Sequence, residues 1–272
     1  MSETIACANQ KGGVGKTTTV VNLATYLAIA GRRVLVLDLD PQGNATSGLG
    51  IDRGSLTETA YEALTDGRPL VDLIVPTGID GLDLVPSAIA LAAVEVELAN
   101  TAQRERHLAR AVASLAHGYD DILVDCPPSP GLLTVNALTA ADAILIPLQC
   151  EYYALEGLGQ LLATIALVQD NLNPDLRIDG VVLTMYDGRT NLSADVAREV
   201  RQHLGAQVYD TVVPRSIRLS EAPSYGQPIA MYGPGSSGAA AYRALAGEYL
   251  ERRQQTAGRP IPISSPSVEA VA

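Results

Sequence analysis

The sequence predicts an α/β fold, a single doubly wound domain in which helices flank a mostly parallel central sheet. Short apolar runs alternate with stretches of helical periodicity along most of the 272 residues. Some runs, such as residues 34–39, are apolar at nearly every position, which is typical of a strand buried on both faces. Neither an internal repeat nor a second core is evident, so we expect one domain over residues 1–255.

The first part of the chain reads as strand, helix, strand, helix. An apolar run at residues 5–8 enters a glycine-rich segment, and from Thr17 apolar positions recur at helical spacing until Gly31 ends the helix. Residues 34–39 form the second expected strand. Ser55 and Glu58 have the spacing of a capping box and predict the start of another helix.

The remaining elements continue the same alternation. Five further strands are expected at residues 81–85, 121–125, 143–147, 178–184 and 211–214. Helices are expected over about 89–116, 155–171, 193–204 and 237–254. The final residues, 256–272, are rich in Pro, Ser and Ala with little periodicity, and we expect a disordered tail there.

The composition excludes several classes of protein. Apolar residues make up 47% and aromatic residues only 4%, all of them Tyr, so the core must be largely aliphatic. No apolar run approaches the roughly 18–20 residues of a membrane span, and no basic-plus-apolar export signal opens the chain. Three cysteines do not make a disulfide framework. We expect a cytoplasmic protein that does not associate with membranes.

The charges are unevenly distributed. The net charge is −11, yet residues 181–272 carry nine arginines and eight acidic side chains. The only lysines are Lys11 and Lys16, in one glycine-rich stretch. Arginine-favouring codon usage is one explanation. The other is that chemistry keeps lysine only where a compact ammonium is needed, since a planar guanidinium does not replace it.

The glycine-rich segment NQKGGVGKTT, residues 9–18, predicts a phosphate-binding loop. Its glycines let successive backbone N–H groups point at a phosphate chain, and the start of the following helix adds its positive dipole end. Lys16 can reach the β- and γ-phosphates, and the Thr17 hydroxyl can bind Mg²⁺. The pattern G-x-x-x-x-G-K-[ST] is not strictly met, because Gln10 occupies the first glycine position. The alternative is a glycine-rich turn that only caps a helix.

Carboxylates follow two of the expected strands. Asp38 and Asp40 end the second strand, and Asp125 ends the strand at residues 121–125. Nucleotide sites in open α/β sheets lie beyond the carboxyl ends of the strands, where such groups can face a metal ion or an attacking water. A single aspartate at a strand end is usually a turn or helix cap. Two such ends together with a phosphate loop indicate function.

Several segments of the chain together resemble a known family. The segments KGGVGKTTT, DLDPQGNATSGLG, DCPPS, RTNLS and VPRSIRLSEAPSYG resemble the ParA/MinD class of deviant Walker A ATPases, which have the P-loop NTPase fold. Within that class the chain is most similar to the ParA/Soj chromosome-partitioning branch, from about residue 4 to residue 254. The resemblance implies ATP and Mg²⁺ as cofactors and slow intrinsic ATP hydrolysis.

The resemblance also implies residue roles. Lys16 acts on the phosphates of its own subunit, and Lys11 reaches across a sandwich dimer to the partner's phosphates, much like an arginine finger. Asp40 positions the attacking water. Thr17 binds Mg²⁺, with Asp125 lying behind the ion's direct ligands. The nucleotide-binding residues implied in this way are Gln10, Lys11, Gly12, Gly13, Val14, Gly15, Lys16, Thr17, Thr18, Pro214 and Ser216, the last two around adenine, where many relatives have Asn in place of Ser216.

The implied partners are a second copy of the chain, DNA and a centromere-binding protein. In the family, the ATP-bound dimer binds double-stranded DNA non-specifically through arginines, and Arg189 and Arg218 match two of them, with Arg215 nearby. Hydrolysis is stimulated by a ParB/Spo0J-type protein, and the implied location is the nucleoid. Taken singly, each arginine is as readily explained as an ordinary surface group, except that Arg218 lies inside the segment RLSEAPS, which favours the functional interpretation there.

Three other members of this class are alternatives. A membrane-positioning ATPase like MinD needs a C-terminal amphipathic helix, and residues 251–272 show no apolar face for one. A redox protein like the nitrogenase iron protein needs two cluster-binding cysteines, and Cys126 does not match those positions. A metabolic ligase shares the loop but not DLDPQGN and RLSEAPS.

Overall fold

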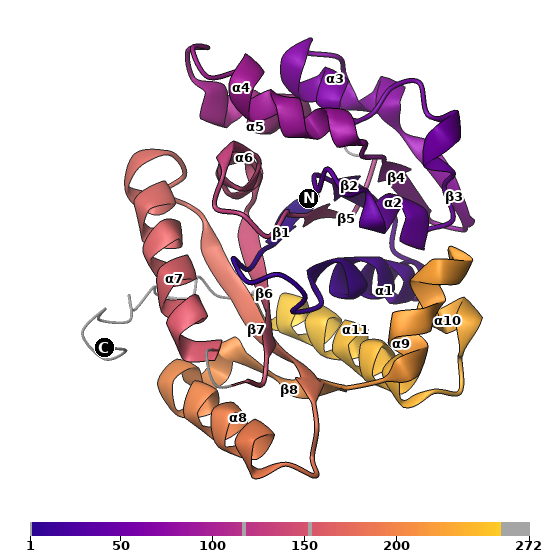
Figure 1. Cartoon of the computed structure of the whole chain (residues 1–272), viewed down its shortest axis with the longest axis vertical. Coiled ribbons are helices and arrows are strands. Elements are labelled where there is room, and N and C mark those ends of the chain that lie inside the picture. Colours follow the sequence, from indigo (N-terminus) through magenta and orange to yellow (C-terminus); the bar gives the residue numbers. More distant parts are fainter. Residues whose placement is uncertain (1, 116–117, 152–153, 257–272) are drawn as a thin grey trace.

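An eight-stranded sheet forms the centre of the computed structural model, which describes residues 2–115, 118–151 and 154–256 (Figure 1). The strand order is β3-β4-β2-β5-β1-β6-β7-β8. Neighbouring strands are parallel, except that β3 runs antiparallel to β4. The strands are β1 Glu3–Cys7, β2 Val34–Asp38, β3 Val75–Ile79, β4 Leu82–Val85, β5 Asp121–Asp125, β6 Ala143–Gln149, β7 Arg177–Tyr186 and β8 Val208–Pro214.

Helices cover both faces of the sheet (Figure 1). One face packs against α3 to α8, and the other against α1, α2 and α9 to α11. The helices are α1 Lys16–Ile29, α2 Asn44–Gly48, α3 Ala60–Thr65, α4 Val94–Glu97, α5 His107–Ala113, α6 Leu132–Ala140, α7 Ala154–Asn171, α8 Asn191–Leu204, α9 Ile217–Glu221, α10 Ile229–Tyr232 and α11 Ser237–Thr256. No helix in the described part of the chain is long and apolar enough to cross a bilayer.

The two cores explain the continuous apolar runs of the central strands. In β2, Leu35 and Leu37 join the core under α5 and α6, while Val34 and Val36 join the core under α1 and α11. Because successive side chains point to opposite faces and both faces are covered, every position is apolar. The doubly wound fold and all seven expected strands are confirmed, with ends shifted by a few residues. The edge strand β3 was not expected, since its sequence VPTGI alternates only weakly and lies half exposed.

The expected capping box at Ser55 and Glu58 is wrong. Helix α3 begins at Ala60, and its capping box is formed by Thr59 and Glu62. The Thr59 hydroxyl accepts from the Tyr61 amide at 3.2 Å, and the Glu62 carboxylate accepts from the Thr59 amide at 2.6 Å. Ser55 ends a short 3₁₀ turn instead.

The expected long helix over residues 89–116 is also wrong. The described part of this segment is broken into α4, α5 and two 3₁₀ turns. Asn136 of α6 stabilises the break, because its side-chain amide donates to the Arg104 carbonyl at 2.9 Å and accepts from the Leu108 amide at 3.2 Å. Helices α2, α6, α9 and α10 were not expected, whereas those near 17–30, 155–171, 193–204 and 237–254 are confirmed. The expected tail lies outside the described residues except for Thr256, so it stays a prediction.

Candidate nucleotide-binding site

The loops that follow β1, β2 and β5 meet at one edge of the sheet. In the parallel register Asp125 lies beside Asp38 on one side and Cys7 on the other. The glycine-rich loop connects Cys7 to α1. It therefore lies at the same edge of the sheet as the two aspartates. The fold therefore brings together the three segments that the sequence indicated separately.

The backbone of the loop is held open by glycines and anchored to the neighbouring strands. Gly13 and Gly15 have φ values of 74° and 90°, a left-handed conformation that favours glycine. The Thr184 hydroxyl of β7 donates to the Val14 carbonyl at 2.8 Å. The Asn9 side chain donates to the Pro147 carbonyl at 2.8 Å and accepts from the Lys11 amide at 3.0 Å. This conformation lies directly before the N-terminus of α1, a ready anion-binding position.

The two lysines of the loop have different surroundings. Lys16 is 6% exposed, and its ammonium donates back to the Lys11 carbonyl at 3.2 Å, across the loop. The ammonium of Lys11 instead contacts Glu151 at 2.8 Å, with over a third of the lysine side chain exposed. Gln10, in the first glycine position, donates to the Thr164 hydroxyl of α7 at 2.9 Å. Lys16 is thus placed over the loop, and Lys11 lies at its outer side.

Asp38 fixes the segment that carries Asp40. Its carboxylate accepts from the Thr46 amide at 2.8 Å, from the Thr46 hydroxyl at 2.7 Å and from the Asp40 amide at 3.2 Å. Burial raises the pKa of Asp38 to about 6. The Ser87 hydroxyl donates to the Asp40 carbonyl, and the Asp40 carboxylate accepts from the Gln42 amide at 2.9 Å. The contacts of Thr46 and Ser87 were not anticipated, because Thr46 has no assigned role within the segment DLDPQGNATSGLG and Ser87 lies outside the quoted segments.

Asp125 is a buried carboxylate without hydrogen-bond partners. Both of its oxygens are enclosed and neither forms a well-aligned hydrogen bond with a described residue, although the Thr17 hydroxyl and the Lys16 ammonium are near enough to lower its pKa. Burial and the neighbouring Asp38 raise its pKa well above the ordinary range. Unpaired buried carboxylates are costly, and a nearby cation relieves that cost.

These residues fit a magnesium ion bound together with a nucleotide. The described residues contain no group of three or more Asp, Glu, His or Cys side chains that could hold a metal ion alone. Mg²⁺ commonly keeps several waters and binds through one or two protein groups and the phosphates of its substrate. The orphaned oxygens of Asp125 can accept hydrogen bonds from waters of such an ion, with the Thr17 hydroxyl as a direct ligand.

A cavity of about 500 Å³ continues from the loop toward β8. Its lining joins Gly15 and Thr18 to Pro214 and Ser216, as expected for residues that share one nucleotide. Tyr242 of α11 also lines it, and its hydroxyl lies 3.1 Å from that of Thr19. The place and lining of this cavity suit a base and sugar next to the phosphate loop.

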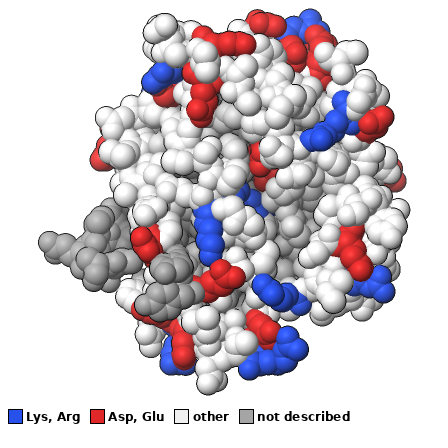
Figure 2. Space-filling model, viewed as in Figure 1, with Lys and Arg blue, Asp and Glu red and all other residues white. Residues whose placement is uncertain are grey.

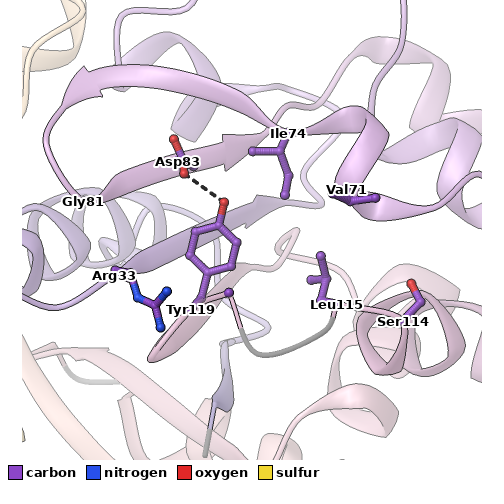
Figure 3. A pocket seen from close by; sticks show the side chains of 9 residues that line it. Arg33, Val71, Ile74, Gly81, Asp83, Ser114, Leu115 and Tyr119 are labelled. Carbon is purple, nitrogen blue, oxygen red and sulfur yellow. Dashed lines mark hydrogen bonds between the residues drawn. The ribbon is translucent and has the colours of Figure 1, made fainter.

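A second cavity of about 520 Å³ lies at the opposite end of the sheet (Figure 3). It is lined by residues that precede strands, among them Arg33, Gly81 and Tyr119. The Tyr119 hydroxyl donates to Asp83 at 2.8 Å across its wall, and burial followed by this hydrogen bond raises the pKa of Tyr119. Because phosphate loops lie at the carboxyl ends of strands, this cavity is remote from the nucleotide chemistry.

The three candidate DNA-binding arginines follow the last two strands of the sheet, with Arg189 after β7 and with Arg215 and Arg218 after β8. Arg189 is 87% exposed and pairs with Asp187 through two contacts of 2.7 and 2.8 Å. Arg189 lowers the pKa of Asp187 most, and Arg215 is close enough to lower it further. Arg218, on α9, contacts Glu221 at 3.4 Å. Basic and acidic side chains lie side by side over the face shown in Figure 2, without a continuous basic stripe.

The amino-acid sequence is similar to partition proteins over nearly its whole length. A family model described as an AAA domain matches residues 2–178. The sporulation initiation inhibitor protein Soj of Bacillus subtilis is 55% identical over 248 residues, which cover 91% of this chain and 98% of that protein. The chromosome partitioning protein ParA of Caulobacter vibrioides is 53% identical over 252 residues, covering 92% and 94%.

Solved structures share the fold. A Mycobacterium smegmatis protein described as cobyrinic acid a,c-diamide synthase, with bound ADP and magnesium, superposes with a TM-score of 0.82 at 41% identity, over 96% of this chain and 98% of its own. The cell division ATPase MinD of Pyrococcus furiosus gives 0.76 at 27% identity, over 92% and 99%. Identity is thus higher to the partition proteins than to the membrane-positioning and metabolic alternatives.

Proposed function

The chain belongs to the ParA/Soj family of chromosome-partitioning ATPases, and we propose that it is an ATP-operated switch that binds DNA as a dimer. ATP closes the dimer, the dimer binds DNA non-specifically, and hydrolysis releases it. The observation that carries the proposal is that the two lysines of the loop have different positions. Lys16 lies over its own loop, while Lys11 lies at the outer side where a second copy can be reached.

The residues of the site perform distinct tasks in this proposal. Lys16 and the amides of the loop bind the phosphates. Thr17 would be a direct ligand of Mg²⁺, and Asp125 would accept hydrogen bonds from waters of that ion. Bound Mg²⁺ offsets the charge that develops on the transferring phosphoryl group. Asp40 orients the attacking water, with its segment held by Asp38. Lys11 leaves Glu151 and stabilises the partner's phosphates, which makes hydrolysis depend on dimerisation.

DNA binding is assigned to the arginine cluster after β7 and β8. Arg189, Arg215 and Arg218 are exposed, and a dimer doubles their number. Non-specific affinity comes from neutralising phosphates and releasing counterions, so it needs local basic groups rather than a basic chain. We propose a ParB/Spo0J-type protein as the partner that accelerates hydrolysis, and a nucleoid-associated location in the cytoplasm.

The test compares ATP-dependent DNA binding by Lys16→Ala, Arg218→Ala and a control, Arg68→Ala. Arg68 is also a surface arginine paired with a glutamate, but it lies beyond α3. We expect Lys16→Ala to lose ATP binding and DNA binding. Arg218→Ala should still dimerise with ATP in sedimentation while losing most DNA affinity, and Arg68→Ala should match the unchanged chain. DNA binding at full strength by both site variants would contradict the proposal.

A further inference from the structure

Each of two candidate DNA-binding arginines already holds a carboxylate of its own chain. Arg189 is paired with Asp187, and Arg218 with Glu221. We propose that Asp187 and Glu221 compete with DNA phosphates for these arginines and so keep the DNA affinity of the dimer low enough for release. This inference rests on the proposed DNA-binding function, and it assigns a role to two acidic residues that the mechanism above leaves unused.

The pair at Arg189 is well formed for a surface contact. The guanidinium reaches both carboxylate oxygens of Asp187, and one of those oxygens also accepts from the Arg189 amide at 3.1 Å. Asp187 itself is only 24% exposed on its side chain, so it is fixed while Arg189 projects into solvent. A phosphate has the same bidentate geometry as this carboxylate and would take its place.

The pair at Arg218 is weaker but its carboxylate is held from a second side. The Glu221 oxygen that contacts Arg218 also accepts from the Tyr232 hydroxyl at 3.0 Å. Tyr232 stacks on Tyr225 with ring centroids 4.9 Å apart, and the Arg218 guanidinium lies 5.8 Å from the Tyr232 ring. Glu221 therefore stays beside Arg218 when a phosphate arrives, and the two negative groups repel each other.

The charges of these residues indicate how much the two acids change the affinity for DNA. Counted together, Arg189, Arg215 and Arg218 with Asp187 and Glu221 carry a charge of +1 per protomer, and neutralising both acids would raise it to +3. Exposed ion pairs contribute little and are screened by salt, so the acids weaken phosphate binding without abolishing it. We expect each neutral replacement to raise DNA affinity by about two- to tenfold.

The experiment measures DNA binding with ATP over a series of salt concentrations for Asp187→Asn, Glu221→Gln, the double variant and Glu58→Gln. Glu58 is the matched control, because it pairs with Arg68 at 3.1 Å in another part of the molecule and its replacement changes the net charge equally. Both Asn and Gln keep an acceptor for the amide or hydroxyl that each acid holds. The two cluster variants should bind DNA more tightly and dissociate at higher salt than Glu58→Gln, and the double variant more so.

The outcomes separate this inference from the function on which it rests. If Arg218→Ala loses DNA binding while both cluster variants bind no more tightly than Glu58→Gln, the competition is overturned and the switch stands. If the unchanged chain with ATP binds no DNA, the competition and the proposed DNA-binding function are both overturned. Sedimentation with ATP and thermal unfolding check that each variant folds and dimerises. Glu221 and Asp187 lie in different parts of the chain. If one variant fails to fold, the DNA affinity of the other still tests the inference.

Discussion

At the scale of single residues, the buried carboxyls of Asp38 and Asp125 lower the stability of the nucleotide-free chain. Both are fully buried at the carboxyl ends of adjacent strands, and their pKa values are raised because burial disfavours the charged form. A carboxyl with a raised pKa in the folded state favours folding only while it remains protonated. The site is therefore most strained at neutral pH and relieved when a cation enters.

We predict that the free energy of unfolding of the nucleotide-free chain falls as the pH rises from about 5 to about 7. Asp38 has a pKa of about 6 folded, and ordinary aspartates are already ionised at pH 5, so the loss comes from the buried pair together with Asp179, whose pKa burial also raises. Its size is on the order of 1–3 kcal/mol, measured by urea unfolding. Magnesium and ADP should flatten the slope.

Asp125→Asn should make the slope shallower, because it removes one buried charge. Asp170→Asn, an exposed aspartate near the end of α7, is the control and should leave it unchanged. An unfolding free energy that rises steadily over this pH range would show that the buried pair does not control stability.

The sequence was sufficient to predict where residues with local spacing lie, while their roles at the nucleotide stay predictions. Lys16 and Thr17 follow the glycines directly, and Asp125 ends an apolar strand. The contacts of Glu151 and Ser87 could not be predicted, because each residue reaches its partner from a distant part of the chain and residue type alone does not assign the contact. Gln10 looked like a departure from the loop pattern, and only the position of α7 shows what its side chain contacts.

At the scale of elements, burial on two faces made the central strands predictable, and tertiary contacts decided where α3 begins. Both Ser55 with Glu58 and Thr59 with Glu62 have capping-box spacing. The second pair is used because Ala60 is buried and its amide donates to the Pro86 carbonyl at 2.8 Å, at the end of β4. A local pattern cannot choose between two equivalent starts, whereas a neighbouring strand can.

We predict that Thr59→Ala lowers the free energy of unfolding by about 1 kcal/mol, since it removes the hydroxyl that caps α3. Ser55→Ala should change it by less than about 0.5 kcal/mol, because Ser55 only donates to the Asp52 carbonyl in an exposed turn. Urea unfolding of both variants at one pH gives the comparison. Equal losses would mean that α3 is not stabilised by this cap.

At the scale of the whole molecule, the proposed dimer would give Lys11 a second partner. Lys11 lies at the outer side of the loop and is occupied by Glu151, an exposed pair of modest strength. Phosphates of a second copy offer more negative charge than one carboxylate. In the proposed dimer, the exchange of Glu151 for those phosphates would link nucleotide binding to assembly and would give both lysines of this lysine-poor chain a task at the phosphates.

The exchange gives a prediction for assembly. Asp40→Ala should lower ATP turnover at least about a hundredfold and trap the ATP-bound dimer, seen by sedimentation with saturating ATP and magnesium. Adding Lys11→Ala should return the chain to monomers, because phosphates buried between two copies would then lack their compensating charge. Lys11→Arg, combined with Asp40→Ala in place of Lys11→Ala, should not restore the dimer fully, since a planar guanidinium differs in shape from the ammonium. Asp40→Ala that stays monomeric with ATP would contradict a dimer closed by Lys11, whatever the DNA affinity of the arginines.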